Sequence, residues 1–566
     1  MSKEPLLPIF KRVIRLTDPF KRKFWLVSII GLLIAPIAVL RPTLVKIMVD
    51  DYILPKQIDT LWIIAGATIG AILLEAFLSY WFNYESKWLG QAIIRRLRLD
   101  IFQHLLRMHL SFFNRTPIGT LTTRTINDVE TINNIFSQGL ITIISDLLTM
   151  LFVIGMMLWT SWKLTLVVLT VFPLLILSTY IFKEKVRASY ELVRSQISKM
   201  NAFLQERISG IHTIKIFRKE QEEQAKFKVI NHAYTQANLN SIFYYAVFFP
   251  VIELISAISA GLMIWYGAGG VLKGEVTIGT LIAFPLYISM LYRPVRMLAD
   301  KFNTLQMGLI VARRIFKILD TQEHIDNHGT IIPKQLTGDI QLKNLSFSYT
   351  PGHPILKEIN LTIPYGKTTA LVGTTGSGKT TLAGLINRSY DVRQGNILIG
   401  SHSIKEYDLQ ALRKRIGVVL QDVFLFRGSV MENILMSNTS ISEETVRLAA
   451  KDIGAHDFFE KLPNGYNFEV MERGTNLSAG QRQLISFVRA LITNPDILIL
   501  DEATSSIDPN TEAIIQKAIT KITEKRTSIV IAHRLGTIQK ADQIIVLDQG
   551  HIIEIGTHKD LLAREN

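Results

Sequence analysis

The residues with the clearest chemical meaning form a glycine-rich run over 373–380. Its glycines let consecutive backbone N–H groups curl around phosphate oxygens, and a helix beginning there adds the positive end of its dipole. Lys379 can reach the β- and γ-phosphates of a nucleotide, and the Thr380 hydroxyl can bind Mg²⁺. A strand-like run over 368–372 precedes the glycines, and a helical stretch over 381–387 follows them. The predicted nucleotide-binding residues here are Gly373, Thr374, Thr375, Gly376, Ser377, Gly378, Lys379, Thr380 and Thr381.

A second chemical feature is an acidic pair further along the chain. The apolar run 497–500 reads as a buried strand, and it ends in Asp501 and Glu502. Beside a phosphate-binding loop, such a strand can deliver one acid to Mg²⁺ through water and another to the water that attacks the γ-phosphate. We therefore predict Asp501 as a metal ligand and Glu502 as the catalytic base. The alternative is an acidic pair that only opens a solvated turn.

Between these two features lies the run Leu477, Ser478, Ala479, Gly480 and Gln481, with a helix expected from Arg482 onward. This run resembles the Leu-Ser-Gly-Gly-Gln signature of the ABC transporter ATPases, with alanine in place of the first glycine. Its order between the glycine loop and the acids strengthens the resemblance. The family's fold is an α/β ATPase domain, so the resemblance implies ATP and Mg²⁺ as cofactors.

The other signature residues of the family are also present in order. The resemblance implies that Tyr349 stacks on adenine and that Gln421 contacts Mg²⁺ and the attacking water. It implies that His533 contacts the γ-phosphate and that Asp508 lies in a loop that crosses to a partner subunit. As isolated residues, each would have an ordinary structural reading, such as a half-buried strand tyrosine or a surface glutamine.

The composition adds a membrane half. Of the 566 residues, 48% are hydrophobic and 19% are charged, below the roughly 25% of a typical soluble globular protein. Segments of about 20 apolar residues are long enough to span a membrane, and six candidates precede residue 320, which excludes a soluble ATPase acting on nucleic acid. The candidates are 24–40, 61–82, 140–160, 164–182, 242–267 and 278–298.

Charge and connection length orient these spans. The net charge of +14 comes from Lys and Arg that flank the apolar runs, which favours membrane orientation over nucleic-acid binding. The stretch 11–23 and the long connections 83–139 and 183–241 are basic, so we predict that they are cytoplasmic. Both connections show helical periodicity, with tips around 112–119 and 210–220 as expected contacts for a cytoplasmic domain. The chain has no cysteine, which excludes disulfides, thiolate metal sites and a catalytic thiol.

The resemblance extends to the exporter branch of the ABC family. Segment 112–119 looks like the first coupling helix of these exporters, and 287–319 looks like their last span and its exit. Segment 472–474 resembles the exporter-specific segment that contacts the coupling loops, although Met471 stands where many exporters have glycine. We predict an amphipathic segment over 1–23, a six-span transmembrane domain over 24–320, a linker over 321–338 and a nucleotide-binding domain over 339–566.

The resemblance implies a half-transporter that works as a dimer in a membrane, which we expect to be the bacterial inner membrane. Ser478, Gly480 and Gln481 of one chain would close the phosphates held by the glycine loop of the other. A homodimer is favoured because both halves of the site follow the family pattern, and a heterodimer stays open. The implied activity is ATP-driven export of a hydrophobic or amphiphilic compound, multidrug-like or lipid, with an ATP-gated channel or regulator as the alternative.

Acids within the apolar spans are the candidate substrate contacts. Glu75, Asp146 and Glu253 lie in the second, third and fifth predicted spans. Ionised groups are expensive in lipid and usually face a cavity or a partner. They could bind a cationic amphiphile, or they could pair with neighbouring helices, and the sequence leaves both readings open.

Overall fold

The computed structural model describes residues 6–350, 352–438, 440–501, 509–532 and 534–564. The chain folds into two compact units. Unit 1 comprises Met1–Leu106 and Ile118–Thr321, and unit 2 comprises Arg107–Pro117 and Gln322–Asn566. A short stretch from the N-terminal half of the sequence is therefore part of the C-terminal unit. The predicted domain boundaries stay predictions.

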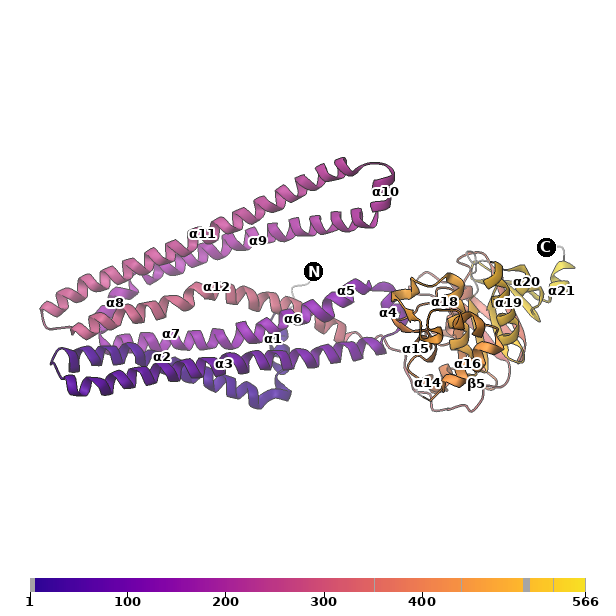
Figure 1. Ribbon diagram of the computed structural model, residues 1–566, viewed down its shortest axis with the longest axis horizontal. Helices are drawn as coiled ribbons and strands as arrows, with labels where there is room; N and C mark the ends of the chain where they lie inside the picture. The colour runs from indigo at the N-terminus through magenta and orange to yellow at the C-terminus, as the bar shows by residue number, and fades with distance from the viewer. Residues whose placement is uncertain (1–5, 351, 439, 502–508, 533, 565–566) are drawn as a thin grey trace. The chain divides into compact units, whose positions relative to one another are not determined.

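The described part of unit 1 consists of long helices joined by short turns (Figure 1). Among the described residues, six helices are long and apolar enough to cross a membrane, and each overlaps one of the predicted spans. The expectation of six spans is thus confirmed. The helices are α1 (Leu6–Arg15), α2 (Lys21–Ile47), α3 (Ile58–Arg107), α5 (Ile118–Thr123), α6 (Val129–Asn134), α7 (Ile141–Thr160), α8 (Trp162–Leu169), α9 (Phe172–Ser209), α10 (Ile211–Ile216), α11 (Glu220–Leu272) and α12 (Ile278–Asp320).

Short non-α segments interrupt this series. The 3₁₀ turn η1 (Asp18–Phe20) leads into α2, and η2 (Met48–Ile53), η3 (Arg124–Asp128) and η4 (Ile135–Leu140) are π-helical. Single π-helical turns inside α-helices are uncommon and often occur at functional positions. No pattern in the sequence indicated them.

Polar contacts fasten the first span to the last. Asp50 accepts hydrogen bonds from the backbone N–H of Gly279 at 2.7 Å and from the hydroxyl of Thr277 at 2.6 Å, which caps the start of α12. A side chain at position 279 would place its Cβ 2.5 Å from the carbonyl oxygen of Lys46. Only glycine allows this close approach, because a Cβ cannot sit inside a backbone oxygen's contact radius.

The two long connections that we predict to be cytoplasmic are helical, as expected. Figure 1 shows α9 and α11 running side by side, with the short helix α10 at their shared end. The rings of Phe182 and Phe248 stack at 3.6 Å along this pair, and the hydroxyl of Ser189 donates to the carbonyl of Ala237 at 3.5 Å. The two predicted tips correspond to α4 (Leu110–Arg115), which belongs to unit 2, and to α10.

The described part of unit 2 contains two main sheets. The larger has the order β12-β11-β3-β10-β9-β6, with parallel pairing from β11 to β6 and an antiparallel edge at β12. The smaller, β2-β1-β4-β5, is antiparallel. The strands are β1 (Ile340–Phe347), β2 (Leu356–Ile363), β3 (Thr368–Gly373), β4 (Gln394–Ile399), β5 (His402–Ser403), β6 (Ile416–Val419), β7 (Gly428–Ser429), β8 (Glu469–Val470), β9 (Ile497–Asp501), β10 (Thr527–Ile531), β11 (Gln543–Asp548) and β12 (His551–Gly556).

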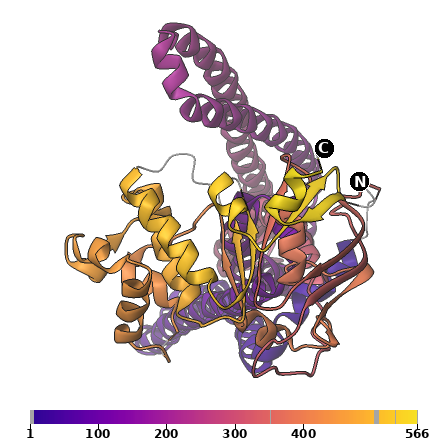
Figure 2. The ribbon, with the colours of Figure 1, turned by 90° about the vertical axis from the view of Figure 1, so that its right-hand side faces the viewer.

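The central strands are apolar on both faces because helices cover both (Figure 2). Leu498 and Leu500 of β9 belong to a core with the helix α18 (Ala479–Leu491), whereas Ile497 and Ile499 belong to a core with α13 (Lys379–Ile386). This alternation is the period of two that a strand imposes. The other helices are α14 (Leu409–Lys414), α15 (Val430–Leu435), α16 (Glu443–Asp452), α17 (His456–Glu460), α19 (Pro509–Thr523), α20 (Leu535–Gln539) and α21 (His558–Leu562), with the 3₁₀ turns η5 (Gly465–Asn467) and η6 (Glu472–Gly474).

Candidate functional site

The predicted phosphate-binding loop joins the end of β3 to the start of α13. Gly376 and Gly378 adopt φ values of +87° and +105°, in the left-handed region that glycine occupies without strain. A Cβ on Gly378 would lie 2.6 Å from the side chain of Leu356. The loop therefore needs glycine both for its backbone conformation and for its packing.

Lys379 is held in place before any phosphate arrives. The residue is only 7% exposed, and its ammonium donates to the carbonyl oxygens of Gly373 and Thr374, each at 2.8 Å. Burial lowers the pKa of Lys379, and the negative charge of Asp501 partly opposes this shift. A phosphate would offer this desolvated cation a stronger partner than two neutral carbonyls.

The predicted metal ligands meet at the carboxyl end of the sheet. Asp501 is the last residue of β9, beside Ile531 of β10, and it is 8% exposed. The hydroxyl of Thr380, from the start of α13, donates to Oδ2 of Asp501 at 3.4 Å. Two predicted ligands that are 121 residues apart in sequence thus come together. Glu502, Asp508 and His533 lie outside the described residues.

The predicted adenine residue lies next to the phosphate-binding loop. Tyr349 follows β1, and its hydroxyl is 3.0 Å from that of Thr381 in α13. Tyr349 is 41% exposed. Gln421 is exposed two residues after the end of β6, and its predicted contact with Mg²⁺ stays a prediction.

The signature run forms a capped helix start. The Ser478 hydroxyl accepts from the backbone N–H of Gln481 at 3.2 Å, and the Gln481 side chain accepts from the backbone N–H of Ser478 at 2.6 Å. This reciprocal capping box starts α18 at Ala479, so the prediction of a helix from Arg482 was three residues late. Gly480 is buried in the first turn, whereas Ser478 and Gln481 are not.

Comparisons with known proteins match this architecture along nearly the whole chain. A family model of the ABC transporter transmembrane region matches residues 24–295, and the ABC transporter model matches 356–505. The ABC transporter ATP-binding protein YknV of Bacillus subtilis (strain 168) is 37% identical, with 98% of this chain and 92% of the relative aligned. The chain belongs to the ABC transporter family.

Other relatives of this ABC transporter carry functional names. The ATP-dependent lipid A-core flippase of Syntrophus aciditrophicus (strain SB) is 36% identical, over 99% of this chain and 93% of its own length. The putative multidrug export ATP-binding/permease protein YgaD of Bacillus subtilis (strain 168) is 36% identical, over 98% of both chains. The fused membrane and ATPase halves make this chain an exporter-type half-transporter. It is a multi-pass bacterial membrane protein with a cytoplasmic ATPase domain. That domain binds ATP and couples its hydrolysis to transport.

The segment that resembles the first coupling helix packs within unit 2. The backbone N–H of His109 donates to the carbonyl of Glu323 at 2.6 Å, and Arg115 forms an ion pair with the Glu323 side chain. The Asn114 amide donates to the hydroxyl of Tyr390 at 3.0 Å. Neither Glu323 nor Tyr390 was singled out from the sequence, because contacts between distant segments leave no local pattern.

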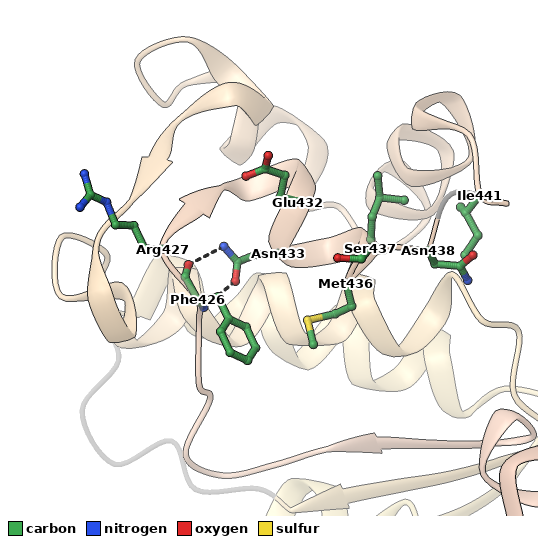
Figure 3. A pocket seen from close by; sticks show the side chains of 9 residues that line it. Phe426, Arg427, Glu432, Asn433, Met436, Ser437, Asn438 and Ile441 are labelled. Atoms are coloured by element: carbon green, nitrogen blue, oxygen red, sulfur yellow. Dashed lines mark hydrogen bonds between the residues drawn. The ribbon is translucent and has the colours of Figure 1, made fainter. Parts of the chain in front are cut away.

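A pocket of about 520 Å³ lies in unit 2 beyond the loop that carries Gln421. Figure 3 shows Asn433 of α15 fixing this loop: its amide donates to the carbonyl of Phe426 at 2.8 Å, and the backbone N–H of Phe426 donates back at 2.9 Å. Apolar and polar side chains share the lining, including Phe426, Met436, Ser437, Asn438 and Ile441. No sequence motif had indicated this pocket.

The three acids of the membrane spans differ in their contacts. Asp146 of α7 forms an ion pair with Lys301 of α12. Glu253 of α11 also has an interaction partner. Glu75, half-buried on α3, forms no hydrogen bond or ion pair with the described residues. Of the two readings left open by the sequence, pairing between helices thus applies to Asp146.

Proposed function

We propose that two copies of this chain export a hydrophobic or amphiphilic compound, multidrug-like or lipid, by alternating access driven by Mg²⁺-ATP. The observation that carries the proposal is the pre-formed phosphate loop, with Lys379 buried beside Asp501, fused to six apolar helices. The names of the two relatives support the substrate class. Lipids and hydrophobic drugs share an apolar body that a cavity between helices can accept.

Magnesium fits the donor set near the loop. Mg²⁺ prefers oxygen ligands and is usually bound by one or two side chains plus substrate phosphates and water. Thr380 and Asp501 supply a hydroxyl and a carboxylate, and Gln421 is a third candidate. The ion would neutralise charge that develops on the phosphates during hydrolysis. Thr380 and Asp501 would orient it, while Lys379 holds the β- and γ-phosphates.

The signature residues would complete the site in a second copy. Ser478 is exposed and Gln481 is half-buried, and the two side chains cap the start of their own helix at the surface, where another chain can reach Ser478. We propose that they, with Gly480 and Asp508, close the nucleotide held by the partner's loop. ATP would then stabilise the closed dimer by differential affinity, and hydrolysis would release it.

The proposed catalytic step is attack of water on the γ-phosphorus. Glu502 would polarise the water, Gln421 would orient it, and His533 would contact the γ-phosphate. Glu502→Gln removes the base while keeping a similar shape, so we expect ATP binding to persist and turnover to fall by about 10²-fold or more. ATP hydrolysis by the chain in lipid vesicles measures this, with Glu524→Gln as a matched control at an exposed glutamate.

Transport by the same vesicles tests the substrate class. Drugs, lipids and peptides are added in turn, and stimulation of ATP hydrolysis is compared with directional flux. Stimulation and outward flux with hydrophobic or amphiphilic compounds support the proposal. Flux that continues down a gradient after ATP is exhausted would instead indicate a channel, and activity that requires a different second chain would indicate a heterodimer.

The second coupling tip is a candidate contact with the partner copy. Ile216 and Phe217, at the end of α10, are 64% and 67% exposed. We propose that they dock into the pocket lined by Phe426 and Met436 in the ATPase unit of the second copy. Because the chain has no cysteine, Ile216→Cys and Met436→Cys introduce the only thiols. A covalent dimer that forms under mild oxidation, and that needs both substitutions, is the expected result.

A further inference from the structure

Tyr390 occupies a position between the first coupling segment and the predicted adenine residue. It lies after the end of α13 and is buried. Its ring meets the ring of Tyr349 edge-on, with centroids 5.1 Å apart and planes at 79°. Its hydroxyl accepts a hydrogen bond from the Asn114 amide of α4 at 3.0 Å. One side chain thus touches both the nucleotide site and the segment that leads to the membrane.

The contacts around Tyr390 continue on both sides. Toward the nucleotide, Tyr349 bonds through its hydroxyl to Thr381 in the first turn of α13. On the side of α4, the centroid of the His109 imidazole lies 5.2 Å from that of the Tyr390 ring. Aromatic pairs prefer edge-to-face contacts and lose attraction when one ring turns alone. A change in the orientation of Tyr349 must therefore be accommodated by Tyr390.

Simple core packing would not require the hydroxyl of Tyr390. A phenylalanine would fill the same space, and Phe347 already packs against this ring at 5.8 Å. A buried hydroxyl needs a partner, and this one accepts a hydrogen bond from Asn114 of α4 and also interacts with the side chain of Tyr349. Burial also raises the pKa of Tyr390, so the group stays a neutral phenol near pH 7.

We propose that Tyr390 is a positioning residue that transmits adenine occupancy from Tyr349 to Asn114 on α4. The proposal rests on the assignment of Tyr349 to adenine made above. Adenine stacked on Tyr349 fixes that ring, Tyr390 adopts the matching orientation, and its hydroxyl sets the position of the Asn114 amide. By thermodynamic linkage, movement of α4 changes the affinity for the adenine moiety by the same factor.

A probe on α4 reads this transmission directly. Leu110 is exposed at the start of α4, and Leu110→Cys gives the full-length chain a single thiol for a fluorescent label. The labelled chain, in phosphatidylglycerol–phosphatidylcholine vesicles, is titrated with a non-hydrolysable ATP analogue and with inorganic tripolyphosphate. We expect the analogue to change the fluorescence and tripolyphosphate, which lacks adenine, to change it at least about fivefold less.

Tyr390→Phe keeps the ring and removes the hydroxyl. We expect the analogue to bind with an affinity within about twofold of the parent, while the response of the label falls at least about fivefold. Asn114→Ala should give the same loss, and the double variant should lose no more, because both changes break one bond. The matched control is Tyr407→Phe, which removes a buried hydroxyl that donates to Ile399 at 3.2 Å, away from α4.

The outcomes separate this inference from the proposed function. An undiminished label response in Tyr390→Phe with the analogue bound overturns the inference and leaves the proposed function standing. An equal loss in Tyr407→Phe also overturns it, because the effect would then be general destabilisation. Failure of the parent chain to bind the ATP analogue at all would overturn both.

Discussion

The two predicted coupling tips are short helices of the same length, but their surroundings differ. Each is a helix of six residues: α4 (Leu110–Arg115) follows the long helix α3, and α10 (Ile211–Ile216) joins the long helices α9 and α11. Of the two phenylalanines of α4, Phe112 is 8% exposed, whereas Phe217 at the end of α10 is 67% exposed. Hydrogen bonds and an ion pair fasten α4 within the ATPase unit of its own chain.

This difference indicates how a half-transporter divides its contacts. The first tip is held by its own chain, because Phe112 is buried there and Asn114 and Arg115 have partners in the same unit. The second tip presents apolar side chains that gain stability only when something covers them. Substitutions in α4 therefore perturb the contact within one chain, and substitutions in α10 perturb the contact that we assign to the partner copy.

Truncation of the two phenylalanines should give the largest contrast. Phe112→Ala opens a cavity beneath α4 and should cost about 3 kcal/mol of stability. Phe217→Ala removes a mostly exposed ring and should change stability by less than about 0.5 kcal/mol while it weakens transport. Thermal inactivation of ATP hydrolysis and vesicle transport measure the two effects. Equal thermal shifts in both variants would contradict the comparison.

The pH dependence should differ between the tips because His109 caps α4. Its Nδ1 accepts from the backbone N–H of Ser111 at 3.1 Å, which requires an unprotonated nitrogen. Burial lowers the pKa of His109, and the attraction of Asp391 and Glu323 opposes this only in part. As the pH falls, His109 therefore takes up a proton in the unfolded chain at a higher pH than in the native chain. The contribution of His109 to the free energy of unfolding is complete above about pH 6.5 and is lost as the pH falls below that value.

His109→Asn tests this sign, because asparagine also caps helices but does not titrate. We expect the variant to lose less thermal stability than the parent between pH 7.5 and 5.5, conditions chosen at about one unit on either side of the histidine value. His212→Asn on α10 is the matched control, since His212 is exposed and Gly210 occupies the capping position there. If His109→Asn loses more thermal stability than the parent between pH 7.5 and 5.5, the proposed role of His109 is wrong.

The ion pairs at the tips should contribute least. Arg115 and Glu323 have side chains 61% and 36% exposed, so a double-mutant cycle should give about 0–1 kcal/mol, decreasing with salt. Lys215 and Glu220 form a local pair at α10 and should give about 0.5 kcal/mol or less. Heat inactivation of the single and double variants measures both. A coupling well above this range at Arg115 would show that the pair, rather than Phe112, holds α4.

The features predicted best from sequence are those that local pattern determines. The phosphate loop around Lys379, the strand before Asp501 and the six spans follow from glycine spacing, apolar runs and length, and the structure contains all of them. The start of α18 was misjudged because the capping box formed by Ser478 and Gln481 was not recognised.

Contacts between distant segments could not be read from the sequence. Tyr390 lies 276 residues from Asn114, and Lys301 lies 155 residues from Asp146. The sequence around each of these residues looks like that of an ordinary helix or turn. The packing of separate segments determines which distant residues come into contact. The hydropathy of one segment does not show which other segment it packs against.

The central claim is that the loop of one copy and the signature of another enclose one ATP. Thr375 and Ser478 are both exposed, so Thr375→Cys in one chain and Ser478→Cys in a second, differently tagged chain can be co-purified and oxidised. We predict a covalent dimer of the two different chains that forms with Mg²⁺-ATP in the Glu502→Gln background and not without nucleotide. Mixed chains that bind ATP yet never cross-link, or that cross-link equally well without it, would contradict the account.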